Sequence, residues 1–104
     1  MDVVGKILIS MNITPDLRGF GQIIDCIYLF DEFPRISFKD MCTKVGDKNG
    51  VKWGAIERNI RYAMLVADKT SQGYKEYVVR KDLTAAKFIR ALEYTTRDIR
   101  RKDE

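Results

Sequence analysis

The sequence has no histidine, only two cysteines and only two prolines among its 104 residues. Without imidazole it lacks the commonest general acid–base group near neutral pH and a common ligand of zinc. Cys26 and Cys42 fall inside apolar helical patterns, where a free thiol behaves as a small hydrophobe. There is also no glycine-rich phosphate loop and no clear nucleophile constellation. We therefore expect no metal, no cofactor, no disulfide and no enzymatic activity.

Long hydrophobic runs are missing as well. No stretch approaches the roughly 20 apolar residues of a membrane-spanning helix. Asp2 and Lys6 interrupt the apolar N-terminal segment before the core of a secretion signal could form. These features predict a cytoplasmic protein with no membrane partner.

The composition is that of an ordinary globular protein, with 45% hydrophobic and 33% charged residues. Its length suits one domain, covering residues 1–104, because two cores could not be built from so few residues. The formal net charge of +4 favours a polyanionic partner without requiring one. Part of this charge lies in a C-terminal cluster of Arg97, Arg100, Arg101 and Lys102, which suits a solvated helix end and non-specific attraction to DNA equally well.

Apolar residues recur at helical spacing along most of the chain, which predicts an all-α fold. The predicted helical segments are residues 3–11, 14–19, 20–30, 37–45, 53–68 and a last helix from residue 84. Ser37 and Asp40 have the spacing of a capping box, and Thr84 is a plausible N-cap. The sequence thus predicts a single-domain bundle of about five to six helices.

Two connections are predicted from local residue types. Residues 46–50, which read Gly-Asp-Lys-Asn-Gly, give the strongest turn signal in the chain. Residues 74–79 alternate between apolar and polar side chains, and we interpret them as an extended connector rather than a strand. In the last helix we expect the terminal arginines to lie outside the core.

The helix over residues 53–68 is amphipathic. Its predicted inner face carries Trp53, Ile56, Ile60, Ala63, Met64 and Ala67, and its outer face carries Ala55, Arg58, Arg61, Tyr62 and Leu65. We expect Trp53 to be a core anchor, because large aromatics are usually buried. A short helix, a glycine-bearing turn and a second helix with a basic outer face form the pattern of helix-turn-helix DNA readers. Arginine suits this face because its planar guanidinium can pair with both acceptors of guanine or clamp a phosphate.

Three stretches resemble one family of regulators. Residues 13–20 read ITPDLRGF, residues 56–67 read IERNIRYAMLVA, and residues 81–92 keep Thr84, Phe88 and Ile89 in register. These segments are similar to the C-terminal DNA-binding domain of the stage-zero sporulation response regulators, whose recognition helix has a V-E-R-A-I-R-H-A pattern. The resemblance spans nearly the whole chain. It implies about six helices, a recognition helix over residues 53–68 and a last helix that contributes to dimer contacts on tandem DNA sites.

The resemblance also assigns candidate DNA contacts. Arg58 and Arg61 come first, and Asn59 and Tyr62 lie beside them, Tyr62 in place of a family histidine. Glu57 has two open roles: it accepts a hydrogen bond from a cytosine amine, or it orients a neighbouring arginine by an ion pair. Phosphate contacts are expected from the two lysines in or next to the turn, Lys48 and Lys52.

Three departures from the family pattern are visible. The segment between Val45 and Val51 suggests a longer turn, and Ala55 stands where the family places an arginine that helps to read the site. The receiver domain that precedes this module in the family is not in the sequence, so we expect control by abundance, dimerisation or a partner.

Two functional hypotheses follow from the sequence. The first is a sequence-specific regulator of transcription that binds double-stranded DNA as a homodimer or in tandem, without a cofactor. The second is a protein-interaction module of the same fold that binds and antagonises a host regulator or an RNA polymerase subunit.

Overall fold

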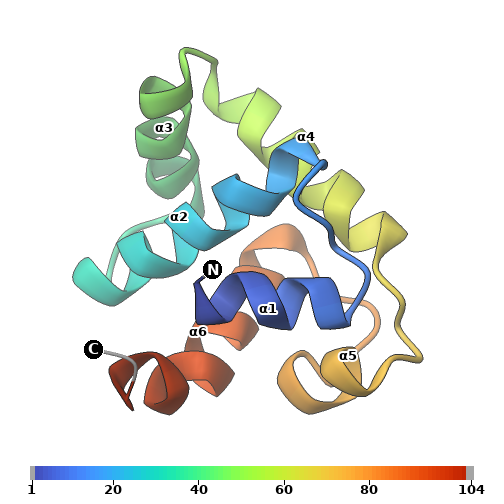
Figure 1. Ribbon diagram of the computed structural model, residues 1–104. Coiled ribbons are helices and arrows are strands. Elements are labelled where there is room, and N and C mark those ends of the chain that lie inside the picture. Colours follow the sequence, from blue (N-terminus) through green and yellow to red (C-terminus); the bar gives the residue numbers. More distant parts are fainter. Residues whose placement is uncertain (1, 103–104) are drawn as a thin grey trace.

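The computed structural model describes residues 2–102 and is all-helical, as the sequence predicted (Figure 1). The six helices of the described chain are α1 (Val3–Ser10), α2 (Arg18–Glu32), α3 (Phe38–Asn49), α4 (Trp53–Val66), α5 (Gln72–Tyr77) and α6 (Ala85–Lys102). One hydrophobic core is shared by all six of these helices, and each contributes a side chain that is at most 2% exposed: Leu8, Ile27, Met41, Ile60, Tyr74 and Phe88. None of the described helices combines the length and the apolarity that a membrane crossing requires.

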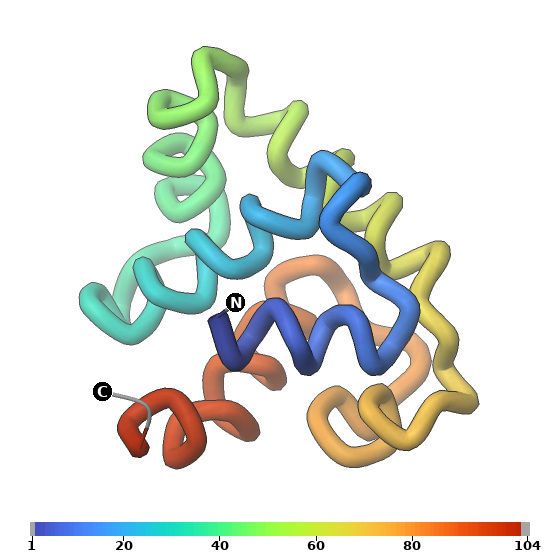
Figure 2. The backbone as a smooth tube through the Cα atoms, in the orientation of Figure 1, coloured from blue at the N-terminus to red at the C-terminus, as the bar shows by residue number. Residues whose placement is uncertain are grey.

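Helix α2 is the centre of the arrangement. It packs against α1, α3, α4 and α6, and the tube in Figure 2 shows it between the pair α3 and α4 on one side and α1 and α6 on the other. Its inner face is apolar and fully buried at Ile23, Cys26 and Ile27. The order of packing therefore places α3 and the start of α4 at one end of the molecule, away from α1 and α5 (Figure 1).

The predicted caps are present where the sequence placed them. The Ser37 hydroxyl accepts a hydrogen bond from the Asp40 N–H (3.0 Å), and the Thr84 hydroxyl accepts one from the Lys87 N–H (3.2 Å). Each satisfies a donor that the first turn of a helix cannot pair internally. These two residues fix where α3 and α6 begin.

Three helix boundaries differ from the prediction. Residues 14–17 form a turn rather than a separate helical turn, and residues 18 and 19 already belong to α2, which begins at Arg18. The interval 74–79 is mostly helical, because Ser71 caps α5 by accepting from the Tyr74 N–H (3.1 Å). The interval 46–50 belongs to α3 up to Asn49, so the turn-forming residues there are helical.

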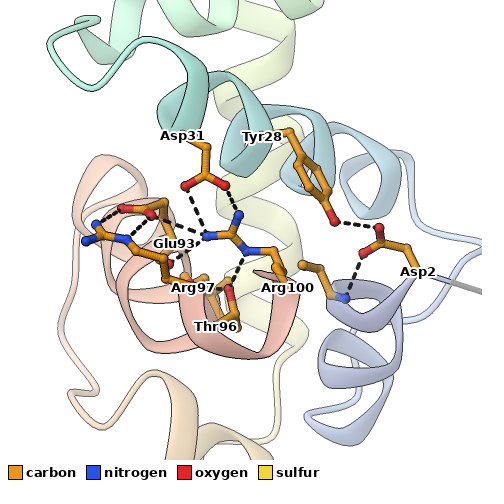
Figure 3. Close-up of polar contacts among 9 residues, drawn as sticks. Asp2, Tyr28, Asp31, Glu93, Thr96, Arg97 and Arg100 are labelled. Atoms are coloured by element: carbon orange, nitrogen blue, oxygen red, sulfur yellow. Dashed lines mark hydrogen bonds and ion pairs between the residues drawn. The ribbon is translucent and has the colours of Figure 1, made fainter. Parts of the chain in front are cut away.

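The C-terminal arginines are not all outside the core, contrary to the prediction. Arg100 is only 3% exposed, and its guanidinium lies among α6 and α2 side chains (Figure 3). It donates to the Thr96 hydroxyl (2.9 Å) and to the Glu93 carbonyl oxygen (2.8 Å), and it forms ion pairs with the carboxylates of Asp31 and Glu93. A buried guanidinium needs this many acceptors, because each unpaired donor would be desolvated without compensation.

Glu93 is the buried anion of the same cluster. It is 2% exposed, and Arg97, on its solvent side, donates two hydrogen bonds of 2.8 and 2.7 Å to its carboxylate. Arg100 also lies 5.4 Å from the ring centroid of Tyr28, whose hydroxyl donates to Asp2 (2.7 Å) in Figure 3. The cluster thus joins α6 to α2, and through Tyr28 it reaches the N-terminal cap of α1.

Candidate nucleic-acid interface

The connection between α3 and α4 is short. Gly50 ends α3 in the left-handed conformation (φ 71°), and residues 50–52 alone separate the two helices. The Val51 N–H donates to the Gly46 carbonyl oxygen (2.9 Å), which closes the end of α3. The longer turn expected from the sequence is therefore wrong, and a three-residue glycine turn is the length that helix-turn-helix units use.

A second glycine allows this turn to fold back on α3. A Cβ built on Gly46 would lie 2.5 Å from the carbonyl oxygen of Val51, a distance that no real Cβ contact tolerates. Glycine at this position inside α3 lets the turn backbone approach the helix, at a cost in helix propensity. The direction in which α4 leaves the turn therefore depends on Gly46 and Gly50 together.

The position of α4 on α2 is set by another close approach. A Cβ on Gly19 would lie 2.5 Å from the carbonyl oxygen of Asn59, so the backbones of α2 and α4 meet there. Beside this contact the Asn59 amide donates to the buried Gln22 side chain (3.0 Å). Asn59, one of the candidate DNA contacts, thus uses its amide to join α4 to α2.

The two faces of α4 separate as the sequence predicted, with one exception. Ile56, Ile60 and Ala63 are fully buried. Trp53 is 40% exposed rather than buried, so the expectation of a core anchor is wrong. It lies at the start of α4, where the ammonium of Lys39 from α3 sits 5.3 Å from its ring centroid.

The outward face of α4 is a continuous stripe. Arg58, Arg61, Tyr62 and Leu65 follow the spacing i, i+3, i+4, i+7, which places them on one side of a helix. All four are exposed, Tyr62 at 57% and Leu65 at 74%. We call these four residues the outer stripe of α4. An exposed leucine of this degree has no structural role in the isolated chain, and the amphipathic pattern alone did not distinguish it as functional.

The two arginines of the outer stripe differ in their partners. Arg61 is bound by Glu57, with Nη2 and Oε1 2.9 Å apart, so the ion pair considered for Glu57 is formed with Arg61. Among residues 2–102, the guanidinium of Arg58 has no ion-pair or hydrogen-bond partner. Of the two arginines, Arg58 is therefore the one with all its donors available to a ligand.

The two candidate lysines lie in different surroundings. Lys52 directly precedes α4 and is exposed, close to the outer stripe along the chain. Lys48 lies in the last turn of α3, not in the turn as expected, and its ammonium pairs with Asp25 of α2 (3.2 Å). Both side chains are exposed, and a surface ion pair such as that of Lys48 contributes little energy.

The net positive charge of the protein is concentrated around these helices. The segment 35–65, which holds α3, the turn and α4, has seven basic and three acidic residues. The rest of the chain has twelve of each, so the whole net charge of +4 arises from this segment. All seven basic side chains are exposed. Such a concentration creates a positive field over one end of an otherwise neutral molecule.

No family model, no curated protein and no solved structure matches this chain.

Proposed function

We propose that the protein is a sequence-specific regulator of transcription that inserts α4 into the major groove of double-stranded DNA. The observation that carries this proposal is the outer stripe of α4, with an unpaired Arg58, on the one segment that holds the whole net charge. The support of α2, α3 and the glycine turn resembles the three-helix arrangement of DNA readers, in which the second helix of the pair meets the bases. The sequence resemblance to the effector domains of sporulation regulators agrees with this reading.

The arrangement suggests a division of roles within α4. The fork of Arg58 matches the O6 and N7 acceptors of guanine, and a good bidentate pair contributes about 1–3 kcal/mol of base discrimination. Arg61 shares donors with the Glu57 carboxylate, so fewer of its donors are available to a base, although a surface ion pair of this kind is weak. Lys52 suits a phosphate beside the groove, where contacts set register without reading sequence. The protein would regulate transcription by binding DNA either as a monomer or as a dimer on tandem sites.

The experiment selects binding sites from a pool of random duplexes and measures the selected duplex and a scrambled one by fluorescence anisotropy across a salt series. A tandem-box duplex of the sporulation regulators is run beside them. Arg58→Gln should weaken selected-site binding by about 1–3 kcal/mol and reduce its advantage over the scrambled duplex. The control, Arg90→Gln, removes an exposed arginine of α6 and should change neither value by more than a small factor. Equal loss in both variants, or no preferred duplex, would refute base reading by α4.

A second function is favoured by one specific observation, the exposure of Leu65 at 74% next to Tyr62 at 57%. Exposed aromatic and apolar side chains on a helix face suit a protein groove better than a phosphate backbone. Under this alternative the protein binds and antagonises a host regulator or a polymerase subunit through the same stripe. Leu65→Ser would then abolish the effect on a reporter gene while leaving duplex affinity unchanged.

A further inference from the structure

A basic hollow lies at the C-terminal end of α4, on the border of the outer stripe. It encloses about 240 Å³, and three cations line it: Arg61 from α4, Lys69 from the loop after α4, and Lys81 from the loop before α6. The remaining lining residues are uncharged, so no carboxylate of the described chain lines the hollow. Arg61 is already paired with Glu57, which does not line the hollow, whereas Lys69 and Lys81 have no ion-pair partner among residues 2–102. The lining of the hollow is therefore positively charged and favours an anion.

The loop that supplies Lys81 is held in a defined shape. Val79 has a φ of 74°, a conformation that is costly for a β-branched residue and persists only where the surroundings impose it. The buried Tyr74 imposes it from α5: its carbonyl oxygen accepts from the Val79 N–H (2.8 Å), and its hydroxyl donates to the Arg80 carbonyl oxygen (2.7 Å). Lys81 follows directly, so its backbone is placed beside α4 before any ligand binds.

We propose that this hollow binds a phosphate of the DNA backbone next to the groove that α4 enters, with Arg61, Lys69 and Lys81 as its ligands. This inference rests on the proposed function and assigns Arg61 to the backbone rather than to a base. The ligand is a phosphate group. Because the hollow lies beside the outer stripe, we take this phosphate to belong to a DNA duplex. A pre-shaped loop beside the reading helix lowers the ordering cost of that contact.

The test compares the salt dependence of duplex binding in four proteins. Lys69→Gln with Lys81→Gln removes two of the three ligands of this one phosphate, and the slope of log K against log salt should fall by about 0.9, the contribution of one phosphate contact. Affinity at low salt should drop roughly tenfold on the selected and the scrambled duplex alike. The matched control, Lys6→Gln with Lys75→Gln, removes two exposed lysines of α1 and α5 and should keep the wild-type slope.

Tyr74→Phe is the fourth protein, because it keeps the buried ring and removes the hydroxyl that holds the loop at Arg80. It should weaken duplex binding by a few fold while leaving both lysine charges and most of the slope in place. An unchanged slope in the lysine pair, or an equal fall in the control pair, would overturn the inference.

The outcomes also separate the two proposals. If Arg58→Gln loses base preference and the Lys69 and Lys81 pair keeps its slope, the reading helix stands and the phosphate contact is refuted. If the wild type binds no duplex, both fail. Titration with inorganic phosphate, followed by the NMR shift of the Lys81 amide, shows whether the hollow binds a free anion. If it does, and the Lys69 and Lys81 double variant keeps the wild-type salt slope of duplex binding, the inference is also overturned.

Discussion

Replacing Arg100 with methionine tests whether the buried ion cluster holds α6 on α2. Methionine keeps most of the aliphatic volume and removes the guanidinium, which is 3% exposed. The substitution leaves Glu93, 2% exposed, with Arg97 as its remaining ion partner, and it leaves Asp31 of α2 without its partner on α6. Breaking a buried pair by removing one partner typically costs about 3–5 kcal/mol. Asp31 is one-third exposed and Arg97 still binds Glu93, so we expect about 3 kcal/mol.

The assay is urea unfolding followed by circular dichroism, with thermal unfolding beside it. A loss of 3 kcal/mol should lower Tm by about 14 °C, because a chain of this length unfolds with an entropy near 0.2 kcal/mol/K. The control is Arg101→Met, which removes an exposed arginine from the same turn of α6 and should change stability by less than about 0.5 kcal/mol. Glu93→Gln should also be destabilising.

Combining Arg100→Met with Glu93→Gln should cost less than the sum of the single changes, because the two groups share one interaction. If Arg100→Met lost stability by an amount within 1 kcal/mol of the control, water would be replacing the ion pairs that the variant removes. The expectation drawn from the burial of Arg100 would then be refuted. Additive single and double changes would contradict the direct coupling of the two groups.

Two further predictions concern the α3–α4 unit and the thiols. Gly46→Ala should destabilise the protein by about 2 kcal/mol, since the added Cβ would clash with the Val51 carbonyl oxygen. In Gly54→Ala of α4 the added Cβ meets nothing within 4 Å, so this variant should stabilise the protein by up to about 1 kcal/mol. The midpoints of urea unfolding check both values. Cys26 and Cys42 are fully buried, and the hydrogen bond to Cys42, together with burial, raises the pKa of the Cys26 thiol. Both thiols should therefore react with a soluble disulfide reagent only at the rate of opening, and reaction at the rate of a free thiol would contradict the packing.

The helical faces and two of the caps were predictable because they depend on local patterns. Ile56, Ile60 and Ala63 repeat at helical spacing and are buried, and Ser37 and Thr84 are caps that a few residues define. The amphipathic pattern of α4 likewise placed the basic outer face correctly. Such features need no knowledge of distant segments.

The remaining features depend on contacts between segments far apart in the chain. Arg100 is buried because Asp31, 69 residues away, lies opposite it, and the sequence of α6 alone contains no sign of that partner. Gly46, Asp47 and Asn49 are poor helix formers, yet they remain helical in α3, where Gly46 packs against the turn that follows. Trp53 is half-exposed because the start of α4 extends past the core to Lys39. In each of these cases a contact outside the helix concerned overrides the structure or burial that the local sequence favours.

Helix α2 links α4 to the Arg100 cluster of α6. Its N-terminal half holds α4 through Gly19 and Gln22, and its last turns hold α6 through Asp31. These two ends of α2 lie about three turns apart, which is near 18 Å along the axis. Under the proposed function, weakening the Arg100 cluster should therefore reduce the folded fraction of the protein without changing which duplex the folded molecules bind best. Changes at Gly19 act directly on α4, because any added Cβ would clash with the Asn59 carbonyl oxygen, so under the same proposal they should alter base preference even in variants that remain folded.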